Sequence, residues 1–543
     1  MQKLIQCFTI LFFLAVLLNE TAFSANEQFR SIASGNWNAN STWEMSTNGG
    51  STWNVATSTP RDTSGAITVR NPNTVTVSAN ISADQLTINT GGILSISPGI
   101  TFTLLDGSGT DFTLQTGASV TGNGTFQTHG VSVTMNIRGG SNFGAFLKVN
   151  SGMTTVADQT SPYEAILFGN VKVDSGATLN SLNTGSYKLY IYGNLINNGT
   201  ITGSGSANTI KFYGASFANN GSITSPTISF DSTTTVSGTG SYTGGAIIVS
   251  GNGNVSLLND VTFSLTDGFT INAGGIFNAN LSTLTFASGT FTIFSGGTVA
   301  SSGLIRTQNS VTLNLRTGSQ FNANLNVASG TTIAAELSSP YKARLYGNVT
   351  IDAGATLSTN NTSSYTLFVY NNIINNGTIT GAGGNNTLEF FGTTLTNNGS
   401  ITSPVFSFDS TSAISGAGTF TGAVILVSGN GNVSLLNSVT FALSSKMSIS
   451  NGGIFSANTH DFTFSSGMFE VLNGGLVAST GLIRTQNSVT LNLRTGSQFN
   501  ANLNVASGTT IAAELSSPFN ARLYGNVTID AGATLSTNNT SSY

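Results

Sequence analysis

Charged residues are scarce in this chain. Of its 543 residues only 7% are Asp, Glu, Lys or Arg, whereas a typical globular domain has about a quarter. The 17 basic and 21 acidic residues give a net charge of −4, which argues against the strongly basic surface that binds nucleic acid. Ser, Thr, Asn and Gly must therefore supply the polar surface.

Cysteine and histidine are nearly absent as well. Cys7 is the only cysteine, and His129 and His460 are the only histidines. A zinc site or a Ser/His/Asp triad needs several suitable side chains to converge, and Cys7 lies in an apolar N-terminal segment. We therefore expect no disulfide, no cofactor and no catalytic residue in the rest of the chain.

Sustained helical periodicity is also missing. Glu and Lys, which favour helices, are rare. Apolar residues instead alternate with Ser, Thr or Asn, as in 291–293 and 311–315, and this pattern predicts short strands. Clusters of Gly, Asn and Ser predict turns between them. The regular apolar residues and the small number of prolines argue against disorder.

What the chain does contain is repeats. Residues 304–365 return almost unchanged as residues 482–543, with differences only at positions 341 and 342 after an offset of 178. A more divergent copy occupies residues 126–187 at the same offset. A long repeat at a fixed offset predicts a repeat architecture.

A shorter period runs inside each long copy. Gly354, Gly377 and Gly399 recur at steps of 23 and 22, and the earlier copy repeats these steps. About 22 residues hold three short strands and three turns, which form one coil of a parallel β-helix with strands about 4.8 Å apart. We expect an all-β, right-handed parallel β-helix (a solenoid), with about eight coils and a rise of roughly 38 Å per long copy.

Residues 1–24 have the pattern of a secretory signal peptide. Lys3 supplies the positive start, the apolar run 4–18 follows, and small residues at 22 and 24 allow cleavage before Ala25. The run is too short for a typical membrane-spanning helix, and no later segment is apolar enough. We therefore expect a secreted or cell-surface protein.

The remaining chain divides by its repeats. We expect a Trp-containing N-terminal cap followed by three long copies of the β-helix, the last of them truncated: residues 25–66, 67–265, 266–443 and 444–543. Tyr543 matches Tyr365, after which the earlier copy continues. This match predicts that the chain is a fragment of a longer protein.

The segment 25–66 holds all three tryptophans, Trp37, Trp43 and Trp53. They could form an aromatic platform that binds sugars. Alternatively, they could form the core of a cap, which an open solenoid end needs because it exposes backbone groups and apolar core. We favour the cap, because terminal units of solenoids differ from the repeats.

Two aspartates offer a calcium hypothesis. Asp106 and Asp111 flank a Gly/Ser loop that is absent from the second long copy, and paired carboxylates can hold calcium. The other ligands of a calcium loop are missing, so an ordinary turn is the favoured interpretation.

Several other acids recur at the offset of 178, namely Asp174, Asp352 and Asp530; Asp231 and Asp409; and Asp158, Glu336 and Glu514. A catalytic carboxylate pair works at roughly 5 to 10 Å, but equivalents eight coils apart are roughly 38 Å apart. We therefore predict structural roles for these acids. The recurring Arg138, Arg316 and Arg494 could pair with an acid on an adjacent coil.

Paired asparagines also follow the short period. Asn198 and Asn220 are separated by one 22-residue step, as are Asn376 and Asn398. We predict that each pair stacks as an amide ladder between neighbouring coils, and that Asn376→Asp destabilises the stack.

The Asn197-Asn-Gly199-Thr-Ile201 repeats, the turn at 352–357 and the near-identical copies resemble large bacterial surface proteins with β-helix shafts, such as filamentous haemagglutinin-type and autotransporter-type adhesins. The opening Ser34-Gly-Asn-Trp37 is similar to the start of β-helix proteins exported by the type IX route. This resemblance implies a cell-surface or secreted location and adhesion.

Three functions follow from these observations. The favoured one is a non-catalytic stalk or adhesin that binds surface glycans or proteins. The first alternative is a polysaccharide lyase or hydrolase on a β-helix, against which the scarcity of charge argues. The second is an ice- or surface-binding solenoid, which would need threonines in strict 22-residue register, and this register is not present.

Overall fold

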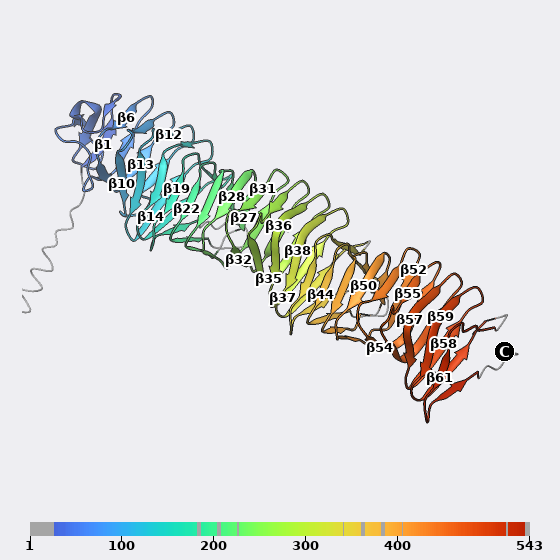
Figure 1. The fold of residues 1–543 in the computed structure, drawn as a ribbon. Helices are drawn as coiled ribbons and strands as arrows, with labels where there is room; N and C mark the ends of the chain where they lie inside the picture. The colour runs from blue at the N-terminus through green and yellow to red at the C-terminus, as the bar shows by residue number, and fades with distance from the viewer. Residues whose placement is uncertain are drawn as a thin grey trace, which may run out of the picture. The chain divides into compact units, whose positions relative to one another are not determined.

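The fold is described by a computed structural model (Figure 1). It describes residues 27–181, 186–203, 208–224, 227–339, 341–359, 364–381, 386–403, 405–516 and 520–537. The predicted signal peptide and Cys7 lie outside these residues. The chain falls into two compact units, unit 1 (Met1–Ser229 with Gly238–Gly245) and unit 2 (Phe230–Ser237 with Ala246–Tyr543).

Short parallel strands build both units. In the described residues the only helical element is the 3-10 turn Asn40–Thr42. In unit 1, strand β11 (Phe112–Leu114) pairs in parallel with β14 (Ser132–Ile137), three strands further along the chain. Three strands therefore make one coil, and about 20 such coils follow one another roughly 22 residues apart. The predicted parallel β-solenoid is confirmed.

The alternating sequence pattern decides which side chains are buried. In β10 (Thr101–Leu105), Phe102 and Leu104 are fully buried while the threonines between them face outward. The same inward positions stack from coil to coil, so Phe102 packs 5.1 Å from Phe126 of the next coil. Burying one such side chain contributes about 1.5–3 kcal/mol, and this core holds the coils together.

Three rows of strands form the sides of unit 2. Side 1 contains β37 (Ser310–Leu315), β39 (Thr331–Ala335) and β42 (Thr356–Ser358). Side 2 contains β40 (Lys342–Leu345), β43 (Thr366–Val369) and β46 (Thr387–Phe390). Side 3 contains β41 (Val349–Ile351), β44 (Ile373–Asn375) and β47 (Thr394–Asn397).

One long copy does not span a whole number of coils. On side 1, each residue has an in-register partner in the next coil. Starting from Val311, eight successive coils contribute Thr332, Leu357, Ile379, Ile401, Phe420, Phe441, Phe464 and Thr485. The counterpart of Val311 is Val489, which lies past the next turn on β58 (Ser488–Leu493). Strand β58 belongs to side 2, because successive pairings connect it to β46. The intervening strands are β49 (Val405–Phe408), β52 (Val424–Ser428), β54 (Val439–Ser450) and β56 (Phe462–Val471). A long copy is therefore eight coils plus one strand, and equivalent residues of copies two and three lie on different sides.

In unit 1, one row of strands carries the surface described below. It contains β15 (Asn142–Phe143), β18 (Glu164–Leu167), β21 (Lys188–Ile191) and β24 (Thr209–Phe212). Only Phe143 and Leu167 are in register between β15 and β18. Before this point the two strands are unpaired, and the loop 158–163 leads into β18.

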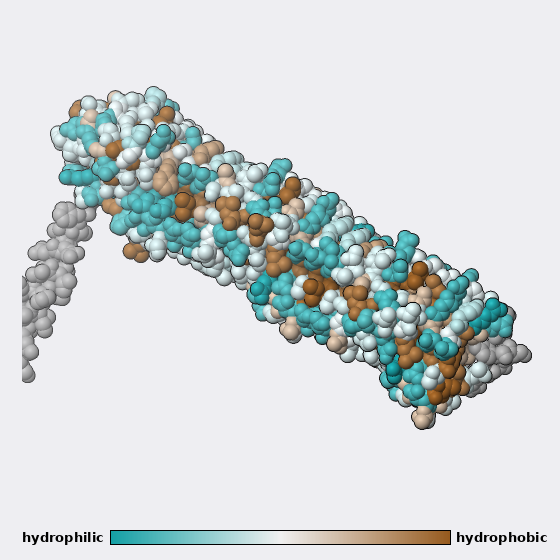
Figure 2. All heavy atoms as spheres, in the orientation of Figure 1, coloured by the Kyte–Doolittle hydropathy of each residue, from teal (hydrophilic) through white to brown (hydrophobic). Residues whose placement is uncertain are grey.

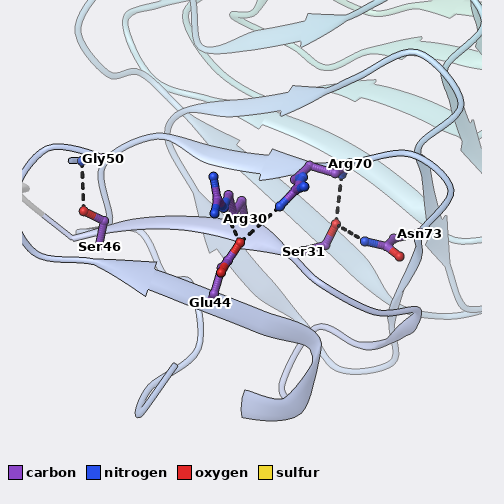
Figure 3. Close-up of polar contacts among 7 residues, drawn as sticks. All are labelled: Arg30, Ser31, Glu44, Ser46, Gly50, Arg70 and Asn73. Carbon is purple, nitrogen blue, oxygen red and sulfur yellow. Dashed lines mark hydrogen bonds and ion pairs between the residues drawn. The ribbon is translucent and has the colours of Figure 1, made fainter. Parts of the chain in front are cut away.

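The N-terminal segment adds antiparallel strands to unit 1. Strand β1 (Gln28–Ser31) pairs in parallel with β5 (Ile67–Val69) but antiparallel with β3 (Trp43–Ser46). Across this hairpin, Glu44 binds the guanidinium groups of Arg30 and Arg70 (Figure 3). This departure from the coil pattern fits the cap interpretation.

Two of the three tryptophans belong to the core of this segment. Trp37 and Trp43 are fully buried and lie 5.2 Å apart, and the indole N–H of Trp37 donates to Pro60 O at 2.9 Å. Trp53 is half-buried, with the Arg30 guanidinium 4.1 Å from its ring centre. A sugar-binding platform made of all three rings is therefore wrong, since two of them have no exposed surface.

Candidate functional site

Exposed aromatic rings form a ladder on unit 1. Phe168, Tyr192 and Tyr213 directly follow strands β18, β21 and β24. The ring centres of Phe168 and Tyr192 are 5.2 Å apart, and those of Tyr192 and Tyr213 are 4.7 Å apart, with the ring planes within 19° and 12° of parallel. Phe168 and Tyr192 are 45% and 43% exposed. The rings thus present a continuous aromatic strip to solvent.

The same ladder recurs on side 2 of unit 2. Tyr346, Tyr370 and Phe391 directly follow β40, β43 and β46. Successive ring centres are 4.8 and 5.1 Å apart, and the planes are within 8° and 17° of parallel. Phe368, on β43, widens the strip because it stacks beside both Tyr370 and Phe391.

Strand register explains why these rings stack. Leu167, Ile191 and Phe212 are paired as the last residues of their strands, so the next residue of each coil falls in the same row. Neighbouring strands are about 4.8 Å apart, which is close to the separation at which aromatic rings stack in an offset arrangement. The ladder therefore needs only an aromatic residue at the same turn in three successive coils.

A groove lies beside the first ring of the unit 1 ladder. It has a volume of about 640 Å³ and is bordered by the turns 117–119 and 140–144 and by Ile166 and Phe168. The groove lies where β15 and β18 are unpaired. On the face shown in Figure 2, hydrophobic side chains form small patches among hydrophilic ones, so a strip of three stacked rings beside a groove is a distinctive surface feature.

Two glycines leave one wall of this groove without side chains. Gly117 and Gly140 occupy stacked turns with φ of +76° and +78°, a conformation that glycine adopts without strain. The N–H of Gly117 donates to Gly140 O at 3.1 Å. Without side chains at these turns, the groove stays open to solvent.

The third long copy has an equivalent groove. Its volume is about 150 Å³, and Arg494, Arg522 and Tyr524 line it together with the turn around Gly496. Tyr524 is 60% exposed and is the counterpart of Tyr346 in this copy. A groove beside an exposed ring is therefore found at the same place in copies one and three.

The recurring acids Asp158, Glu336 and Glu514 fix the loop that borders this surface. Glu336 is 1% exposed and accepts hydrogen bonds from the backbone N–H groups of Thr317 and Lys342, both at 2.6 Å. Asp158 accepts from the Gly139 and Thr160 amides in the same manner. These bonds tie the turn of one coil to the strand of the next, as the predicted structural role requires.

The third of these acids shows the electrostatic effect of the arrangement. Burial alone would raise the pKa of Glu514, but the amides of Thr495 and Asn520 and the Thr495 hydroxyl stabilise the carboxylate and lower its pKa overall, with help from Arg494. In the first two copies the buried hydroxyls of Tyr187 and Tyr365 lie near the acid. Burial, together with Asp158 and Glu336 respectively, raises the pKa of each tyrosine well above its usual value.

The carboxylates of the calcium hypothesis bind backbone amides. Asp106 accepts from the N–H groups of Val131 and Ser132 at 3.1 and 3.0 Å. Asp111 accepts from Gly107 and Thr134, both at 2.7 Å. These contacts fit the turn interpretation, and within the described ranges no group of three or more His, Cys, Asp or Glu side chains is placed to hold a metal ion.

The remaining recurring acids have local partners. Asp174 forms ion pairs with Lys148 at 3.3 Å and Lys172 at 2.8 Å. Asp352 and Asp530 each accept from an asparagine amide, Asn326 and Asn504 respectively. Asp231 and Asp409 are half-buried beside the strands that they follow.

The recurring arginines differ in what they contact. Arg138 donates to the Thr160 hydroxyl, and the Arg316 guanidinium lies 5.7 Å from the centre of the Phe294 ring. Arg494 borders the third-copy groove and lowers the pKa of Glu514. An acid on an adjacent coil is therefore a neighbour of Arg494, whereas Arg138 and Arg316 contact a hydroxyl and a ring.

The asparagine ladders are confirmed. The Asn220 amide donates to Asn198 Oδ1 and the Asn398 amide to Asn376 Oδ1, both at 2.9 Å and both near solvent. A second ladder, which the sequence analysis missed, lies one residue earlier. Asn375 and Asn397 are fully buried and joined by a 2.8 Å bond.

The exposed aromatic ladder was also missed. Its members stand at positions 168, 192 and 213, so the first step is longer than the second and a search at a strict coil period does not align them. The signal that could have found them is the repetition of aromatic residues at the same places in the next long copy.

The fold and its surfaces define a parallel β-solenoid with an aromatic ladder in copies one and two and a groove in copies one and three. In the part of the chain that the structure describes, no helix has both the length and the apolar character needed to span a membrane. No family model, curated protein or solved structure matches the chain.

Proposed function

We propose that this chain is part of a non-catalytic secreted or cell-surface repeat protein, a stalk or adhesin that binds glycans through its aromatic ladders. The observation that carries the proposal is the recurrence of three stacked rings, two exposed and the third half-buried, at equivalent places in copies one and two. Contiguous exposed apolar surface marks interaction sites more often than scattered residues do.

The geometry suits a carbohydrate. The C–H face of a sugar ring packs on an aromatic ring, and a row of rings offers successive contacts to a chain of sugars. The neighbouring groove in unit 1 adds backbone and side-chain polar groups from Ser119, Ser141 and Asn142, which can bind sugar hydroxyls. A few polar groups beside aromatic side chains are typical of small-ligand sites.

Non-catalytic binding is supported by the state of the recurring acids. Asp158, Glu336 and Glu514 are at most 1% exposed, and their oxygens accept bonds from backbone amides. A general acid or nucleophile has to reach the substrate, so buried carboxylates of this kind serve the fold.

The test is binding to a panel of soluble and insoluble polysaccharides. Replacing Tyr346, Tyr370 and Phe391 with alanine, together with the equivalent rings of unit 1, should weaken binding by at least about tenfold, since aromatic contacts at an interface commonly contribute more than about 1 kcal/mol. The control is Val131→Ala with Leu281→Ala, which removes exposed apolar side chains (81% and 89% exposed) outside the ladders.

Circular dichroism should show that both variants keep the wild-type fold. Absence of binding to every polysaccharide, or equal binding by the ladder variant and the wild type, would refute the proposal. Release of reducing ends during incubation would show instead that the protein cleaves its ligand.

A further inference from the structure

Basic residues gather at the first ring of the copy two ladder, Tyr346, and at its counterpart in copy three, Tyr524. Arg316 and Arg344 lie there in copy two, and Arg494 and Arg522 occupy the same positions in copy three. Arg494 and Arg522 line the groove together with Tyr524. In copy one the second arginine of each pair is replaced by Ile166.

This clustering is unusual for so weakly charged a chain. Only eight of its Lys and Arg residues follow position 300, and five of them are at these two sites: Arg316, Lys342, Arg344, Arg494 and Arg522. Two of the other three, Lys446 and Arg484, form ion pairs with Glu470 and Asp461. Positive charge is thus concentrated beside the aromatic rings.

The four arginines take part in none of the ion pairs found among the described residues. The Arg344 guanidinium lies 5.0 Å from the centre of the Phe368 ring, and Arg316 lies over Phe294. A guanidinium stacked on a ring keeps N–H donors at its edge, which match the two oxygens of a carboxylate or sulfate.

The nearby acids hold other groups or lie further along the ladder, although Arg494 also stabilises the Glu514 carboxylate. Glu336 and Glu514 are buried and hold backbone amides of the bordering loop. Glu389 lies on the coil after Phe368, to which it is paired, and Asp409 follows one coil later. The basic groups therefore border the start of the ladder, and these two acids lie further along it.

We infer that the copy two ladder and the copy three groove beside Tyr524 bind anionic polysaccharides, whose sugar rings stack on the aromatic side chains while carboxylate or sulfate groups bind the arginines. The inference rests on the proposed function, because it assigns the chemical class of the glycan. The copy one ladder has Ile166 where the others have arginine and suits a less charged sugar chain.

The experiment compares an acidic polymer, polygalacturonate, with an uncharged glucan, using the whole chain. Wild-type binding to polygalacturonate should be the tighter of the two and should weaken as salt rises, because ion pairs near the surface are screened. The variant R316Q/R344Q/R494Q/R522Q should lose at least about tenfold in affinity for polygalacturonate and keep its affinity for the glucan. The corresponding lysine variant should be intermediate, because lysine lacks the two-pronged geometry.

The outcomes separate the two proposals. If the rings are needed for binding but the glutamine variant binds polygalacturonate as the wild type does, the arginine inference is wrong and the glycan proposal stands. If polygalacturonate does not bind, the inference is wrong, and binding to the rest of the polysaccharide panel decides the glycan proposal. If the ladder instead mediates association of two copies of this chain, sedimentation will show a dimer that the ladder variant abolishes, and this result also overturns the inference.

Discussion

The two adjacent asparagines of copy two allow a matched test of the solenoid's internal hydrogen bonding. Asn375 is fully buried and donates to Asn397 Oδ1 at 2.8 Å and to Ser400 O at 3.1 Å. Its neighbour Asn376 is exposed and accepts, through Oδ1, a bond from Asn398. The change from Asn to Asp therefore breaks two donated hydrogen bonds at the first position, whereas the bond between positions 376 and 398 uses only an oxygen that Asp retains.

The expected costs follow from this difference. Asn375→Asp leaves two buried acceptors without a donor, at about 1–3 kcal/mol each, or roughly 2–6 kcal/mol together. The new carboxylate also loses solvation. Asn376→Asp keeps an acceptor for the Asn398 amide, and an exposed substitution of this kind changes stability by less than about 0.5 kcal/mol. The structure thus moves the predicted destabilisation from Asn376 to Asn375.

Hydrogen exchange is the appropriate assay, because coils of a solenoid can open locally. Asn375→Asp should accelerate exchange of the amides in β44 and β47 by at least about tenfold, which corresponds to about 1.4 kcal/mol. Strands several coils away should be unaffected. Lower pH should reduce the defect, since burial raises the pKa of the new carboxyl and its protonated form can donate one bond. Equal exchange in the two variants would refute the assignment of Asn375 to the buried ladder.

Two further predictions concern the acids that fix the loops. Glu336→Gln places an amide group against the N–H donors of Thr317 and Lys342 and should reduce local stability by about 1–3 kcal/mol, measured by hydrogen exchange in β40. The control is Asp267→Asn, at an exposed site. An equal effect of the two substitutions would contradict the role of Glu336. The pKa of Glu514, the third-copy acid, is lowered in the folded protein. The carboxylate therefore contributes to stability above the usual glutamate pKa of 4.5, and this contribution should be lost as pH falls below that value. Protection of the amides in β60 (Thr509–Ala513) should therefore decline below about pH 4.5, and Glu514→Gln should flatten this decline; an unchanged pH profile would count against it.

The coil period was predictable because glycine turns recur almost regularly. Each coil must pass the same turns to stack on its neighbour, so Gly354, Gly377 and Gly399 retain the spacing even where other residues differ. The strands were predictable for a related reason, since alternate residues enter the core, as in β10.

The candidate site was less predictable, because coil length varies near the ladder of unit 1. The loop 158–163 lengthens one coil, and the step from Phe168 to Tyr192 is longer than the step from Tyr192 to Tyr213, which hides the ladder from a search at one fixed period. The buried asparagine ladder was hidden differently, since two isoleucines precede the chemically identical Asn375 and Asn376, and the sequence does not show which alternate residues of β44 face the core.

The extra strand in each long copy has a consequence for how such a gene evolves. In unit 2, a position one long copy further along the chain lies on the next side, as Val311 on side 1 and Val489 on side 2 show, while parallel strand pairing continues between the coils. Duplicating a long copy therefore lengthens the solenoid and also rotates each repeated surface by one side about the solenoid axis. Successive copies joined in this register would turn the same ladder toward each of the three sides before it returned to the first, so that a change in copy number alters the direction of every surface beyond it.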